Sequence, residues 1–169
     1  MLRLNDDLNA LEGSLPPGKL DVLLAVKTER GGLLTDSLLS WKKHVRRFGA
    51  EVEQAFHGSH DVFGGDDYIA ALLVRERIQD ALSKINDDDL RGKVSEWVET
   101  VDRDFMDLTV EDSDAVVARR AAAILGRECG SSWWWARLPR QGPVRQDLFS
   151  NEGPARHARA LRHRRARGQ

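Results

Sequence analysis

The stretch that decides the fold is Leu34–Phe56, LTDSLLSWKKHVRRFGAEVEQAF. Its large apolar side chains recur every three or four residues, which places them on one face of an α-helix, with most charged side chains lying away from it. That stripe consists of Leu34, Leu38, Trp41, Val45, Phe48, Val52 and Phe56. Thr35 or Asp36 can cap the start of the helix, and Gly58 can end it. The pattern therefore predicts a long amphipathic helix over residues 37–56.

Three later segments show the same spacing and are joined by short polar connections. Asp66 or Asp67 can cap the first of them, whose inward stripe is Ala71, Val74, Ile78, Ala81 and Ile85. The stripe of the second is Leu90, Val94, Trp97, Val101, Phe105 and Leu108, which predicts that Trp97 lies in the core. The last begins at Ser113 or Asp114, turns Val117, Ala121, Ile124 and Leu125 inward, and ends at Gly126.

The first thirty residues are less regular. A short helix fits 2–15, and Pro16-Pro17-Gly18 ends it. Residues 20–30 fit either a strand or a helix, and we favour a helix because no second strand is evident. The expected fold is all-α: a bundle of four to five amphipathic helices within residues 1–130, followed over 131–169 by a Trp-rich strap and an irregular, basic C-terminal tail.

The charge of the chain changes sign at three consecutive tryptophans, Trp133, Trp134 and Trp135. Residues 1–135 contain 17 Lys and Arg against 25 Asp and Glu, a net charge of −8. Residues 136–169 contain 9 Arg against 2 acidic residues, a net charge of +7. Such an asymmetry bears on partners and solubility rather than on the fold.

The three tryptophans allow two interpretations. Adjacent residues cannot share one helix face, so at least one ring turns outward unless the whole segment packs into a groove. Because tryptophan is usually well buried, we favour a strap that closes the bundle. The alternative is an exposed aromatic site for a protein partner, formed by Trp133, Trp134 and Trp135.

The C-terminal tail is rich in arginine and lacks aromatic residues after Phe149. Its basic residues are Arg156, Arg159, Arg162, Arg164, Arg165 and Arg167. They could bind nucleic acid through its phosphates, although no aromatic side chain is present for base stacking. They could instead clasp the acidic body, or form an extension with no selected role.

A metal-dependent hydrolase of nucleotides or phosphoesters is the alternative from another functional class. His57 and His60 could act with Glu96, Glu99 and Asp102 on a neighbouring helix. The spacing matches no established metal motif, so we expect no bound metal and no cofactor. The apolar stripes leave few polar residues for an active-site cleft. The leading hypothesis is therefore a non-enzymatic adapter or regulatory protein that binds a protein partner.

Composition narrows the cellular setting. Residues 2–15 do not resemble a signal peptide, and no apolar stretch approaches the length of a membrane span. Cys129 is the only cysteine, so the chain cannot form an internal disulfide. We therefore expect a cytoplasmic protein that does not bind membranes.

Truncation after Phe149 tests the three interpretations of the tail. We expect little change in the melting temperature and no nucleic-acid binding at physiological salt, because the acidic body repels the same ligand. Thermal melts and a fluorescence-anisotropy titration with an oligonucleotide measure both quantities. Salt-sensitive binding at about 150 mM salt that disappears on truncation would contradict this expectation and make nucleic acid the leading partner.

Overall fold

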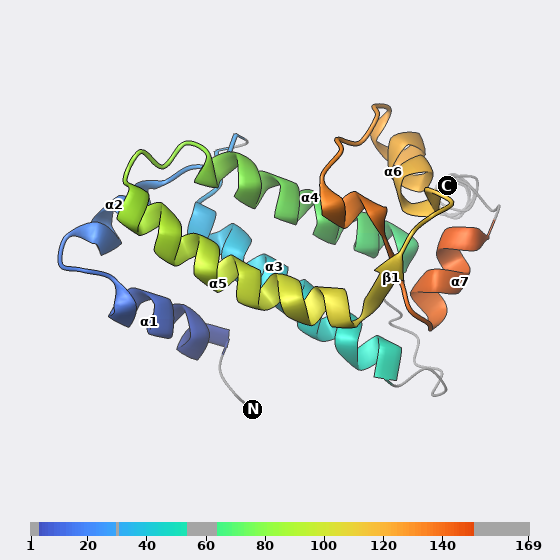
Figure 1. The fold of residues 1–169 in the computed structure, drawn as a ribbon, viewed down its shortest axis with the longest axis horizontal. Helices are drawn as coiled ribbons and strands as arrows, with labels where there is room; N and C mark the ends of the chain where they lie inside the picture. The colour runs from blue at the N-terminus through green and yellow to red at the C-terminus, as the bar shows by residue number, and fades with distance from the viewer. Residues whose placement is uncertain (1–3, 30, 54–63, 151–169) are drawn as a thin grey trace, which may run out of the picture.

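A computed structural model describes residues 4–29, 31–53 and 64–150, and it is mostly helical, as predicted (Figure 1). Three long helices run side by side: α3 (Leu34–Glu53), α4 (Gly65–Leu82) and α5 (Asp88–Asp107). Two shorter helices, α1 (Leu4–Ser14) and α2 (Lys19–Ala25), precede them. Among the described residues, no helix is both long and apolar enough to cross a membrane.

Helix α3 confirms the stripe predicted for it. Six of its seven members are buried, namely Leu34, Leu38, Trp41, Val45, Phe48 and Val52, whereas Phe56 lies outside the described residues. The helix begins three residues earlier than predicted, so Thr35 lies inside its first turn and does not cap it. Gly49 gives up helix propensity, but a side chain there would come within 3.3 Å of Leu108 on the connection after α5. The absence of a side chain at Gly49 therefore lets Leu108 pack closely against α3.

Helix α4 is the central element, because it contacts α3, α5, α6 and α7. Its buried side chains are not confined to one narrow stripe; they include Tyr68, Ile69, Ala71, Leu72, Arg75, Ile78, Ala81 and Leu82. A helix that is apolar on several sides must be covered on several sides. Helices α3, α6 (Val116–Leu125) and α7 (Pro143–Phe149) supply much of that cover.

Helix α5 buries four of its six predicted stripe residues, but its buried face extends toward Val98 and Asp102 rather than toward Trp97. Its buried residues are Leu90, Val94, Val98, Val101, Asp102 and Phe105. Trp97 is only partly buried, so its predicted place inside the core is wrong: it lies at the edge, in a hollow shared with Leu11 of α1. The ammonium group of Lys42 lies 5.7 Å from the centre of the Trp97 ring. The indole therefore packs its apolar body on the core edge and faces a cation on the other side.

The start of the chain settles the choice between helix and strand. Residues 19–25 form the helix α2, as we favoured, and after it Lys27 and Leu33 form an isolated antiparallel bridge. In the connection between α4 and α5, Asp87 caps the start of α5: its carboxylate accepts a hydrogen bond from the Leu90 N–H at 3.0 Å. Lys19 reaches Asp87 from α2, which ties the front of the chain to the α4–α5 connection.

Residues after 130, expected to be irregular, form short elements up to Phe149. The 3₁₀ helix η1 (Trp133–Ala136) leads into strand β2 (Arg137–Pro139), which pairs antiparallel with β1 (Thr109–Glu111). The register places Val110 opposite Leu138. The side chains that these elements bury are Trp134, Trp135, Leu138, Val144 and Leu148. This segment therefore shares one core with the long helices.

Helix α6 begins differently from its prediction. Neither Ser113 nor Asp114 caps it; the carboxylate of Asp112 accepts the Val117 N–H at 2.7 Å instead. Val117 and Ala121 are buried as predicted, but Ile124 is exposed. Gly126 ends the helix with φ of 66°, in the left-handed conformation that glycine adopts without strain, as predicted.

Helix α7 supplies the cap of α4 from the far end of the chain. The carboxylate of Asp147 accepts the Gly65 N–H at 2.7 Å, and Asp67 accepts the Gly64 N–H at 3.0 Å. A side chain at Gly65 would come within 2.9 Å of Asp147, so glycine lets the two helices meet. Negative charge is favourable at a helix N-terminus. The C-terminal helix therefore stabilises the start of α4 as well as covering it.

Replacing Leu148 with alanine tests whether α7 belongs to the core. Leu148 is 5% exposed, whereas its neighbour Phe149 is 49% exposed. We expect Leu148→Ala to lower the free energy of unfolding by about 2–5 kcal/mol, and the matched Phe149→Ala to change it much less. Urea denaturation measures both values. Equal effects of the two substitutions would show that α7 is not packed as described.

Candidate functional site

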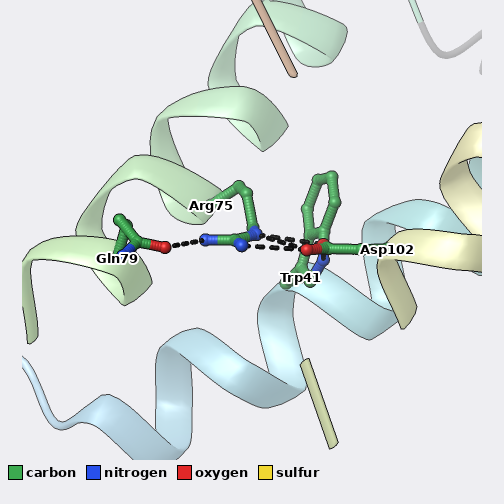
Figure 2. A network of polar contacts seen from close by, with 4 residues as sticks. All are labelled: Trp41, Arg75, Gln79 and Asp102. Atoms are coloured by element: carbon green, nitrogen blue, oxygen red, sulfur yellow. Dashed lines mark hydrogen bonds and ion pairs between the residues drawn. The ribbon is translucent and has the colours of Figure 1, made fainter. Parts of the chain in front are cut away.

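A buried ion pair joins α4 to α5 at the centre of the protein. The Nε and Nη2 atoms of Arg75 donate to the carboxylate of Asp102 at 2.8–3.0 Å, in a two-pronged arrangement (Figure 2). Arg75 is 5% exposed and Asp102 is 4% exposed. A charged pair at this depth carries a large desolvation cost, so each partner requires the other.

Two further side chains hydrogen-bond to this ion pair, and the ring of a third covers it. Trp41 of α3 donates its indole N–H to Asp102 at 3.0 Å, and Gln79 accepts from Nη1 of Arg75 at 3.3 Å (Figure 2). The ring of Trp134 covers the guanidinium, with the Arg75 Cζ 4.4 Å from the ring centre. Residues of α3, α4, α5 and η1 therefore meet at one polar centre. We call Trp41, Arg75, Gln79 and Asp102 the central network.

Aromatic rings connect this network to the surface. Phe105 lies 5.2 Å from Trp41 and 6.2 Å from Trp133, measured between ring centres. Trp133 in turn meets Trp134 edge to face at 5.8 Å. The exposed ring of Trp133 thus contacts two buried aromatic side chains, Phe105 and Trp134, which restrict its movement.

Two cavities flank the central network. The first, of about 280 Å³, is lined by Arg75, Gln79, Leu82, Ser83, Arg91, Ser95, Val98 and Glu99, and we call it the Ser95 cavity. The second, of about 350 Å³, is lined by Glu99, Asp102, Arg103, Met106 and Trp133, and we call it the Trp133 cavity. The lining of the first cavity comes mainly from α4 and α5, so it lies between these two helices.

The Trp133 cavity combines an apolar wall with a polar margin. Trp133 is 37% exposed and Met106 is 39% exposed, both high for large apolar side chains at a concave surface. Glu99 and Arg103 are exposed beside them. Such a combination suits an apolar group of a partner, because the walls exclude water and the margin stays solvated.

The predicted tryptophan site divides into two parts. Trp134 and Trp135 are buried and pack inside the protein, as the strap interpretation required. Only Trp133 presents a ring to the surface, so it alone of the three is available to a partner. The sequence pattern predicted at least one outward ring unless the whole segment packs into a groove, and it could not identify which ring that is.

The predicted acidic residues lie at different depths on α5. Asp102 turns inward and is engaged by Arg75 and Trp41, whereas Glu96 and Glu99 are exposed. Lys93 forms an ion pair with Glu96 at 3.6 Å. Within residues 4–29, 31–53 and 64–150, no group of three His, Cys, Asp or Glu side chains could hold a metal ion.

The predicted histidines and tail arginines fall outside the described residues, and two other titratable groups, Cys129 and Tyr68, lack activating surroundings. His57 and His60 fall in the undescribed stretch 54–63, and the arginines at 156, 159, 162, 164, 165 and 167 fall in 151–169. Cys129 is a free thiol, and partial burial raises its pKa, which keeps it protonated near neutral pH. Burial also raises the pKa of Tyr68 well above its usual value, so the hydroxyl remains a donor to the Arg137 carbonyl.

Sequence reasoning missed the central network. Comparisons of the chain with protein-family models, with curated proteins and with solved structures found no match. The assignment of a site therefore depends on the geometry of these side chains alone.

Replacing Asp102 with alanine tests the central network. The substitution leaves the Arg75 guanidinium buried without a counter-charge, so we expect the free energy of unfolding to fall by about 3–5 kcal/mol. Asp104→Ala, on the exposed face of the same helix, is the matched control and should change it by about 0.5 kcal/mol or less. Urea denaturation followed by circular dichroism gives both values. A small and equal effect of the two substitutions would contradict the buried ion pair.

Proposed function

We propose that this protein is a non-enzymatic helical interaction protein that binds a protein partner at the Trp133 cavity. The observation that carries the proposal is the half-exposed ring of Trp133 beside Met106 at a cavity of about 350 Å³. Tryptophan is among the residues that contribute most to binding energy at protein interfaces. An apolar side chain of the partner would fill this cavity.

The surroundings of Trp133 favour binding in two ways. Phe105 and Trp134 hold the ring in place, so little conformational entropy is lost when a partner orders it further. Glu99 and Arg103 give the margin one charge of each sign, which suits a polar rim around a small apolar centre. The partner is therefore expected to present an apolar side chain flanked by polar groups.

The hydrolase alternative has weaker support. Its Asp102 already forms the ion pair with Arg75, and the acids Glu96 and Glu99 lie on the exposed side of α5. A carboxylate held by a buried guanidinium is a poor ligand for a second cation, because binding would leave Arg75 without its counter-charge. The adapter hypothesis requires no such rearrangement.

Comparative affinity purification tests the proposal with two variants and a control. Trp133→Ala removes the aromatic wall, and Met106→Lys places a charge in the cavity without removing the ring. Phe149→Ala removes an aromatic side chain of similar exposure on α7. We expect a partner retained by the wild-type protein and by Phe149→Ala, and bound at least about 30-fold more weakly by Trp133→Ala, the size of loss typical of a central interface residue.

Quantitative mass spectrometry of the retained proteins, followed by titration of the purified partner, measures this difference. Circular dichroism must first show that each variant keeps its helical content. An identical set of retained proteins for all four forms of the chain would contradict binding at the Trp133 cavity.

A further inference from the structure

The Ser95 cavity contains hydrogen-bond donors that nothing in the described residues satisfies. A guanidinium group has five N–H donors. Arg75 uses Nε and Nη2 toward Asp102 and one N–H of Nη1 toward Gln79, which leaves two donors on a side chain that is 5% exposed. Buried donors without acceptors are costly, and Arg75 is one of the residues that line this cavity. An acceptor bound there would remove that cost.

Neighbouring groups add to this donor set. Within the described part of the chain, the Ser95 hydroxyl has no hydrogen-bond partner, and the amide nitrogen of Gln79 donates to nothing. Ser95 lies one turn before Glu99 on α5, and Gln79 lies one turn after Arg75 on α4. Donors from both helices therefore surround one space.

The charge balance of the cavity selects among possible acceptors. Asp102 offsets Arg75, and Asp88 offsets Arg91, so the lining has no excess positive charge. A doubly charged phosphate would be poorly compensated there, whereas a single carboxylate needs only the unused donors. A carboxylate is therefore the acceptor that fits best.

Glu99 adds a negative charge at this cavity, which can bind a positively charged group of the same ligand. Glu99 lines the same cavity, and its carboxylate forms no ion pair with any described residue. An ammonium group beside the bound carboxylate could reach it, while Leu82 and Val98 offer a small apolar surface. The volume of about 280 Å³ lies just below the range usual for drug-sized ligands, so it suits a smaller molecule.

We propose that the Ser95 cavity binds a small zwitterion of the α-amino-acid class. Its carboxylate accepts from Arg75 and Ser95, its ammonium group donates to Glu99, and a short aliphatic side chain lies against Leu82 and Val98. This site is separate from partner binding at Trp133, although Glu99 lines both cavities.

Titration of the ¹⁵N-labelled full chain with L-valine, followed by two-dimensional NMR at constant ionic strength, tests the proposal. We expect saturable shifts of the Ser95 and Gln79 signals. Acetate carries only the carboxylate and isobutylamine only the ammonium group, so each should bind at least about tenfold more weakly, having lost one charged hydrogen-bonded contact.

Two variants identify the residues responsible. Glu99→Gln should weaken L-valine binding at least about tenfold, whereas Glu96→Gln, exposed on the same helix, should leave it unchanged. Ser95→Leu should abolish binding by filling the cavity, with thermal melts confirming that the variant folds. Absence of shifts, acetate binding as tightly as L-valine, or unchanged affinity in Glu99→Gln would each overturn the proposal. These outcomes are independent of the measurements on Trp133→Ala and Met106→Lys, which test binding of the protein partner.

Discussion

The ion pair between Arg75 and Asp102 is the constraint on which the rest of the structure depends. Neither charge can be buried alone, so α4 and α5 must align wherever the two side chains meet. The indole N–H of Trp41 then requires α3 to approach the same carboxylate. One carboxylate thus sets the relative positions of the three long helices. A purely apolar interface would tolerate sliding by a turn far more easily, because apolar contacts are not directional.

The same constraint explains where the open spaces lie. Polar side chains beside the ion pair cannot pack as densely as the apolar faces that α3 presents, so cavities remain on both sides of it. Trp134 covers the guanidinium from above, which makes η1 part of the core. Its neighbour Trp133 is consequently held at the edge of one cavity. The candidate partner site and the candidate zwitterion site are therefore both consequences of one buried charge pair.

Much of the helical fold could be predicted from periodicity, because the stripe from Leu34 to Val52 has no competing interpretation. The orientation of α5 could not be predicted, because either Trp97 or Val98 can complete its apolar stripe. The burial of Asp102 in the structure decides in favour of Val98. A signal for the ion pair was present: Arg75 and Asp102, of opposite charge, lie directly beside stripe residues, next to Val74 and Val101. Strands β1 and β2 have only three residues each, too few for a periodic pattern, and their paired residues, such as Val110 and Leu138, lie far apart in the sequence.

Hydrogen exchange of two side-chain protons tests the central network most directly. The Trp41 indole N–H and the Arg75 Nε–H both donate to Asp102 in the core. Both should therefore resist exchange about as long as the most protected backbone amides of α3 and α4, because only global unfolding releases them. Two-dimensional NMR after transfer into deuterated water measures these rates. Exchange of either proton as fast as that of the exposed Trp133 indole would contradict the buried ion pair and the arrangement of helices built on it.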